Sequence, residues 1–186
     1  LIDSLQKAKA LKINIYAMVS ASQKNIDFYL KKGVYKTDQL NVCSFKMYGD
    51  GALGSRGACL HKPYSDSPKQ LGALLSSIAN LKKVATQIAK SDFQLNSHAI
   101  GDSANSVLLK IYKEALQGKK DRRWKIEHAQ VLQETDFDYF KTGIIPSVQP
   151  THATSDMYWA PDRLGKERII NAYAFKKLLD YAGLVA

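Results

Sequence analysis

The chain has 186 residues, 45% of them hydrophobic, so it can bury a sizeable core and is too apolar to be a disordered chain. No apolar run approaches the ~18 residues of a membrane span, and we expect no membrane-embedded segment. The formal net charge is +10, but the basic residues are scattered over polar faces without interleaved aromatic residues. We therefore favour a solvated basic surface over a nucleic-acid-binding module.

The two cysteines, Cys43 and Cys59, are too few for a disulfide scaffold. Cys43 lies in an apolar segment and Cys59 in the loop that follows. A reduced, cytoplasmic protein is the simplest interpretation.

Hydrophobic spacing, β-branched content and glycine positions predict alternating helices and strands along the chain. In the first half we expect a helix end over 1–11, a strand over 12–19, a helix over 25–32, a strand over 40–48, a loop over 49–66 and a helix over 67–90. In the second half we expect strands over 93–99, 124–129 and 144–148, helices over 103–116, 134–141 and 168–181, and the start of another strand at 184–186.

This alternation is typical of βαβ units and a parallel sheet, so we expect an α/β fold. There is no linker or internal repeat, and we assign a single domain over 1–186. The alternatives are an open doubly wound sheet and a (β/α)8 barrel. A complete barrel needs about 250 residues. Because the chain starts on a helix and stops as a strand begins, we expect a partial (β/α)8 TIM barrel, about strands 3 to 7.

Lys46 lies inside the apolar strand that ends at the turn Gly49-Asp50-Gly51. A lysine on a buried strand costs several kcal/mol unless it is neutralised, paired or modified. This strand end therefore carries either chemistry or a compensated charge, such as an ion pair of Lys46 with Asp50 or Glu127.

Polar groups recur at the ends of four consecutive predicted strands, which meet at one edge of a parallel sheet. They are Lys46 and Asp50, His98 and Asp102, Glu127 and His128, and Gln149 and His152. One buried histidine is more often a hydrogen-bonded core residue than a ligand. Three at the same topological position favour a functional site.

Neutral imidazole is the commonest metal ligand, and a catalytic zinc site takes about three protein ligands and leaves one position open. His98, His128 and Lys46 would form such a set only if Lys46 were carbamylated. A carbamylated lysine presents a carboxylate and loses its positive charge, which would also account for its burial.

Four segments, KMYGDGALGSR, LNSHAIGD, KIEHAQ and SVQPTHATSDMYWAPDRLG, resemble in order and spacing the amidohydrolase superfamily. The resemblance is closest to its YtcJ-like branch, which includes N-substituted formamide deformylases. It implies a distorted (β/α)8 barrel with one or two divalent metals, usually zinc, that hydrolyses amide or other C–N bonds of a small molecule by metal-activated water.

The resemblance also implies roles for individual residues. Lys46 matches a carbamylated lysine that bridges two metals, and His98 and His128 match the metal ligands of the next two strands. The predicted catalytic residues are His152, which would face the substrate, and Asp50. The remaining matched loop positions, assigned to the substrate pocket with Asp50, are Gly51, Arg56 and Asp156.

Two metal-binding features of the family are not found in this sequence: the His-x-His pair of the first strand and the aspartate of the eighth. The alternative interpretation is therefore a catalytically inactive, truncated barrel fragment. An unclosed parallel sheet exposes edges and apolar faces, so we expect a homo-oligomer or marginal stability.

Overall fold

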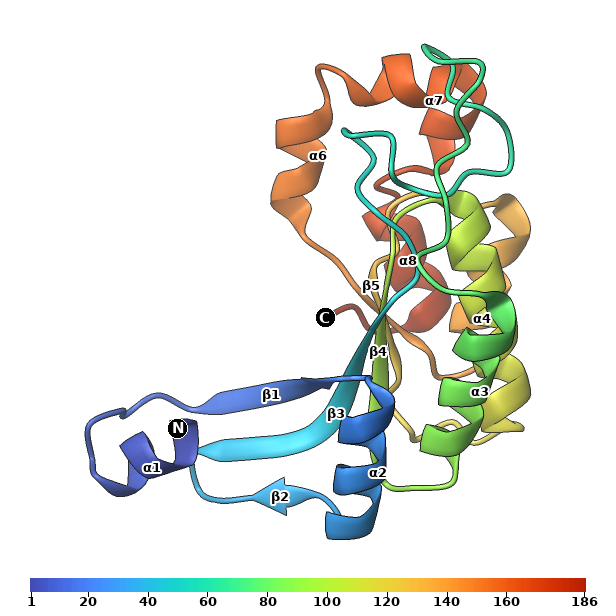
Figure 1. The fold of residues 1–186 in the computed structure, drawn as a ribbon. Helices are drawn as coiled ribbons and strands as arrows, with labels where there is room; N and C mark the ends of the chain where they lie inside the picture. The colour runs from blue at the N-terminus through green and yellow to red at the C-terminus, as the bar shows by residue number, and fades with distance from the viewer.

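A parallel sheet runs through the centre of the computed structural model, which describes all 186 residues (Figure 1). The strands are β1 (Ile15–Ser20), β2 (Tyr35–Lys36), β3 (Leu40–Tyr48), β4 (Gln94–Ala99), β5 (Lys125–His128) and β6 (Ile145–Ser147). The order is β1-β3-β4-β5-β6, all parallel, and the short β2 pairs antiparallel with β3. Strand order follows chain order without the reversal of a doubly wound sheet, which is the arrangement of a barrel.

Helices follow each parallel strand. They are α1 (Ile2–Lys7), α2 (Gln23–Lys32), α3 (Ile78–Ala89), α4 (Asp102–Leu116), α5 (Phe137–Phe140), α6 (Pro150–Asp156), α7 (Ala160–Arg168) and α8 (Phe175–Ala182), with 3-10 turns η1 (Glu134–Asp136) and η2 (Ile169–Asn171). Figure 1 shows α3 and α4 side by side along one face of the sheet, and α6 and α7 grouped at one end of it. None of the helices combines the length and the apolar character that a membrane span requires.

The main core lies between the sheet and the helices that cover it. Phe45, Leu95 and Ile126, from three neighbouring strands, are fully buried there against residues of α3 and α4. Burying one such side chain contributes about 1.5–3 kcal/mol. Because side chains alternate along a strand, packing Phe45 against the helices turns Lys46 to the opposite face.

A second, smaller hydrophobic cluster closes the end of the sheet at which the parallel strands finish. Leu53 and Tyr64 of the loop after β3 pack there with Leu164 of α7. Two arginines tie the same parts together: Nε of Arg163 donates to the Gly54 carbonyl at 3.3 Å. The guanidinium of Arg168 donates to the carbonyls of Lys62 and Pro63, at 2.8 Å each.

The predicted helix over 67–90 is wrong for its first eleven residues, since α3 begins only at Ile78. The backbone before it bonds to the loop: Leu60 N donates to Leu71 O at 2.7 Å, and Leu75 N to Gly49 O at 2.8 Å. Gly72 has φ +67°, and a Cβ there would lie 2.0 Å from the Ala58 carbonyl oxygen. These contacts override the apolar spacing that suggested a helix.

The predicted helix over 168–181 is also interrupted. It is divided among the end of α7, η2 and α8, and Tyr173 between them has φ 53°. Three elements, β2, α6 and α7, were not predicted from the sequence, and the first helix is shorter than expected. The expected start of a strand at the C-terminus has backbone support, because Ala186 N donates to Pro146 O at 3.0 Å and Val148 N donates to Ala186 O at 2.7 Å.

Candidate metal centre

Three histidine rings form a row at the end of the sheet where the parallel strands finish. His98 precedes the last residue of β4 and His128 is the last residue of β5, with ring centroids 4.6 Å apart. His152 lies in the first turn of α6 and not on a strand, and it stacks on His128 at 5.6 Å with an interplanar angle of 9°. The fold thus brings the three predicted histidines together.

His98 is largely removed from water, with a side chain 15% exposed. Burial lowers its pKa to about 4, and neighbouring His128 adds to the effect. The ring is therefore neutral at neutral pH, and its contact with Asp50, 3.5 Å between Nε2 and Oδ1, is not an ion pair there. Nε2 of His98 is buried and makes no hydrogen bond.

The Asp50 side chain connects the ends of β3 and β4 through hydrogen bonds. Its carboxylate accepts hydrogen bonds from the backbone N–H groups of Cys59 at 2.8 Å, Ile100 at 3.0 Å and Gly101 at 2.8 Å. Burial raises its pKa to about 6, although these three donors act in the opposite direction. Since the residue is 1% exposed, its predicted catalytic role stays a prediction, and its contacts are those of a residue that positions the loop after His98.

His128 ends β5 in an unusual backbone conformation. Its φ is 77° and that of Ala129 is 43°, a left-handed region that non-glycine residues rarely occupy and that costs about 1–3 kcal/mol each. Burial lowers the pKa of the ring, and its Nδ1 lies 2.5 Å from Oε1 of Gln149. Such strain persists only where the surrounding structure enforces it.

Lys46 makes neither of the ion pairs considered as an alternative. Its Nζ lies 5.6 Å from the centroid of the Tyr48 ring, and no carboxylate is within salt-bridge distance. Burial lowers the pKa of this half-buried amine, while Glu127 acts in the opposite direction. Oε1 of Glu127 is itself buried without a hydrogen-bond partner. Carbamylation of Lys46 stays a prediction.

The donor set fits part of a metal centre. His98 and His128 offer two adjacent neutral imidazoles, one with an orphaned nitrogen, and Lys46 lies on the neighbouring strand. No three His, Cys, Asp or Glu side chains of this chain lie close enough together to hold a metal ion by themselves. A third ligand would have to be Lys46 in its carbamylated form or a group from outside these residues.

The other predicted pocket residues have partners of their own. Arg56 pairs with Asp66 at 2.9 Å. Asp156 accepts from the Tyr173 hydroxyl at 2.9 Å. Gly51 allows close approach of the backbone, since a Cβ there would lie 3.2 Å from Gly57. These contacts connect the loops around the histidine row.

Asp102, another strand-end candidate, lies outside the row. Its carboxylate accepts from the backbone N–H of His61 at 2.9 Å and from Nε2 of Gln133 at 3.3 Å. Tyr48 was not among the predicted site residues, and its half-exposed ring lies 5.9 Å from that of His98. The alternation that turns Lys46 away from the core also applies two residues later and could have identified it.

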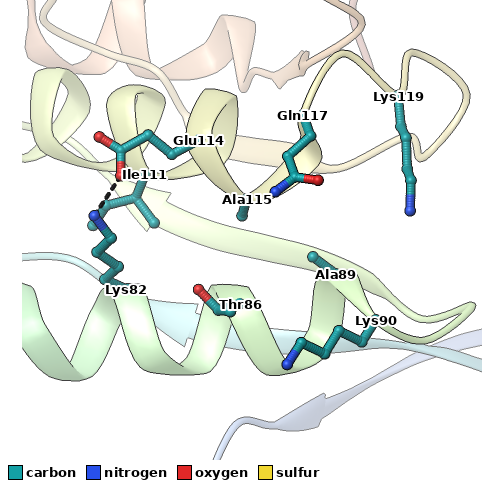
Figure 2. Close-up of a pocket in the computed structure, with 9 residues that line it drawn as sticks. All are labelled: Lys82, Thr86, Ala89, Lys90, Ile111, Glu114, Ala115, Gln117 and Lys119. Carbon is teal, nitrogen blue, oxygen red and sulfur yellow. Dashed lines mark ion pairs between the residues drawn. The ribbon is translucent and has the colours of Figure 1, made fainter.

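Two hollows of similar size lie in different parts of the molecule. One, of about 350 Å³, lies beside the end of β3 and is lined by Lys46, Tyr48 and residues of α3. The other, also about 350 Å³, is a groove between α3 and α4 on the outer helix layer (Figure 2). Only the first contains residues of the candidate centre.

The amino-acid sequence is similar to those of known proteins. The sequence model of the Amidohydrolase family matches residues 2–185. Protein LONG AFTER FAR-RED 3 of Arabidopsis thaliana is 32% identical over 184 residues, covering 97% of this chain and 32% of that protein. Putative amidohydrolase YtcJ of Bacillus subtilis strain 168 is 33% identical over 144 residues, covering 77% of this chain and 27% of that protein.

Two solved structures share the fold. They are uncharacterized metal-dependent hydrolases from Pyrococcus horikoshii OT3 and Pyrococcus furiosus, with TM-scores of 0.85 and identities of 31% and 30%. Each superposition covers 96% of this chain, and 36% and 37% of the respective hydrolase. The chain spans about a third of the length of these relatives. The family match over 2–185 and the shared fold confirm the predicted resemblance and the partial (β/α)8 barrel: this chain belongs to the amidohydrolase family.

Proposed function

We propose that this chain forms the central part of a metal-dependent amidohydrolase that hydrolyses amide or other C–N bonds of a small molecule. The observation that carries the proposal is the row of His98, His128 and His152 at the end of the parallel strands. Membership in the amidohydrolase family and the metal-dependent hydrolases among its structural neighbours support the same reaction class.

His98 and His128 would hold a divalent ion, for which we propose zinc, with carbamylated Lys46 as a further ligand. Such an ion, when bound, acidifies a water molecule and polarises a carbonyl group. The two histidines suit this role because burial lowers the pKa of both rings, and a neutral imidazole keeps a lone pair for a ligand.

His152 would act on the substrate. It lies on α6, which has no buried residue, and its ring stacks on that of His128. We propose that it donates a hydrogen bond to the carbonyl oxygen of the substrate as negative charge develops there. Asp50 would contribute indirectly, by holding the backbone that follows His98.

A second candidate is that these residues alone hold no metal and are catalytically inactive. It is supported by the lack of any three His, Cys, Asp or Glu side chains arranged to hold an ion. In that case the remaining ligands would come from parts of the protein outside these 186 residues.

Metal content after exhaustive dialysis tests the proposal, by elemental analysis of the wild type, His98→Ala and His128→Ala. We expect about one or two ions per wild-type chain and none in either variant, because each variant removes one of the few ligands. The exposed His61 provides the matched control, and His61→Ala should keep its metal.

Each outcome has a distinct meaning. Full occupancy in both strand-end variants would contradict the proposed centre. A metal-free wild type would support the second candidate. Stoichiometric metal would be followed by hydrolysis assays with formamides and acylated amines, in which the proposal expects activity that His152→Ala reduces.

A further inference from the structure

The ring of His128 contacts two other histidine rings and its backbone is held in place, but one freedom remains. His98 approaches it with an interplanar angle of 70°, and His152 stacks on it at 9°. A half-turn of an imidazole about its last side-chain bond keeps the ring in the same plane and exchanges the sides on which Nδ1 and Nε2 lie. The stacking of His152 on the ring therefore does not determine which nitrogen is available to a ligand.

The backbone of His128 is held independently of the ring. The positive φ angles of His128 and Ala129 are followed by Gln130, whose carbonyl accepts from the Tyr173 N–H at 2.8 Å. The Gln130 side chain also donates to the Tyr173 hydroxyl at 2.9 Å. These bonds hold the backbone next to His128 in place. They do not determine which ring nitrogen of His128 is available to a ligand.

The side chain of Gln149 contacts one of the two ring nitrogens of His128. Its Oε1 lies 2.5 Å from Nδ1 of His128, and an amide oxygen can only accept a hydrogen bond. The contact is a hydrogen bond only when Nδ1 carries the proton, and that tautomer leaves the lone pair of the neutral ring on Nε2. The sheet brings the two residues together, because Glu127 of β5 is paired with Ser147 of β6. His128 follows Glu127 directly, and Gln149 lies two residues after Ser147.

We propose that Gln149 is the positioning residue of His128, fixing the tautomer and orientation in which Nε2 is available to a metal ion. The inference rests on the proposed function, since it assigns His128 to the metal. It has a second consequence, because Gln149 is also the N-cap residue of α6. The same contact ties the start of the helix that carries His152 to the centre.

The experiment compares Gln149→Leu with Gln149→Glu in the protein at its full natural length. Leucine removes the acceptor, whereas glutamate restores an oxygen at the same reach. Gln70→Leu is the matched control, because Gln70 is exposed and its side chain makes no hydrogen bond. Nitrogen-15 NMR of histidine-labelled, metal-free protein reports the tautomer of His128, assigned by the signal that His128→Ala removes.

We expect the Nδ1–H tautomer in the wild type, in Gln149→Glu and in the control, and its loss or mixing in Gln149→Leu. Competition titrations with zinc and cobalt should show affinity about 10- to 100-fold weaker for Gln149→Leu, as for other partners of metal-bound histidines. Gln149→Glu should stay close to the wild type. If Gln149→Leu does not fold, the shorter Gln149→Asn, whose oxygen cannot reach Nδ1, provides the same comparison.

Two results would overturn the inference: an Nε2–H tautomer of His128 in the wild type, or unchanged tautomer and affinity when the acceptor is removed. Failure of the proposed function has a different signature. The wild type would then show the Nδ1–H tautomer, with its dependence on Gln149, and would bind no metal.

Discussion

Two hollows of this molecule have the same volume of about 350 Å³ and opposite characters. In the groove between α3 and α4, Lys82 and Glu114 pair at 2.6 Å while both side chains are 59% exposed (Figure 2). The second hollow is lined by Lys46 and Tyr48, and the Tyr48 ring lies 5.9 Å from that of His98. Beside this hollow, the His98 side chain is 15% exposed and that of Asp50 is fully buried. Charged groups are solvated in the first hollow, whereas ionisable groups beside the second are removed from water.

The difference indicates why size alone does not identify the functional site. Water satisfies the lysines of the groove, so their presence costs little free energy. Polar atoms at the strand ends, such as Nε2 of His98 and Oε1 of Glu127, are buried without a partner. Such burial costs free energy and is typical of places where a ligand or a reaction uses the group.

The largest expected effect on stability follows from removing the Asp50 carboxylate at the strand ends. Asp50→Ala leaves the three backbone donors of Cys59, Ile100 and Gly101 without their acceptor. Each unpaired buried donor costs about 1–3 kcal/mol, so we expect a loss of roughly 3 kcal/mol or more in the free energy of unfolding. Urea denaturation measures it.

Asp92→Ala is the matched control, because Asp92 is exposed and its side chain makes no hydrogen bond or ion pair. It should change the free energy of unfolding by less than about 0.5 kcal/mol. Equal free energies of unfolding for Asp50→Ala and Asp92→Ala would contradict the distinction between buried and solvated polar groups.

How much the sequence predicts also differs between regions. The alternation of strands and helices, the parallel sheet and the positions of His98 and His128 were predictable, because local periodicity and the rule of strand ends determine them. The loop before α3 was not. Leu71, Leu74 and Leu75 have helical spacing, and their segment is nevertheless irregular because its backbone bonds to distant residues.

Some missed features had local signals. Gly72 interrupts the predicted helix, and the Ser77 side chain accepts from Asn80 N as the cap of the helix that does form. Pro150 stands at the first position of α6, where proline is favoured. The contact of Gln149 with His128 had no such signal, because it joins residues 21 positions apart and depends on the register of two strands.

A smaller effect concerns the pH dependence of stability, to which the neighbouring His98 and Asp50 contribute in opposite directions. The pKa of His98 is about 4 in the folded protein and 6.5 ordinarily, so its contribution, full above pH 6.5, is lost as the pH falls toward 4. The pKa of Asp50 is about 6 against 3.8, so its contribution, full below pH 3.8, is lost as the pH rises to 6. Between pH 4 and 6 the two oppose each other.

His98→Ala should leave the Asp50 contribution uncompensated. We expect the free energy of unfolding of the variant, relative to that of the wild type, to rise as the pH falls from 6 to 4. The slope should be at most about 1.4 kcal/mol for each pH unit. Denaturation in the presence of a chelator measures it, with Thr86→Ala in the groove as a control that keeps the wild-type profile. A difference between His98→Ala and the wild type that stays constant over this range would contradict the assignment.

The smallest expected effect lies in the groove itself. A double-mutant cycle of Lys82→Ala and Glu114→Ala should give a coupling of about 0.2–1 kcal/mol, because both partners stay in contact with water. The coupling should shrink further in 1 M salt, where the screening length is about 3 Å. Metal content should be the same in all four proteins of the cycle. A coupling well above this range would contradict the solvated character of the groove. A loss of metal would show that the groove and the strand ends are energetically linked.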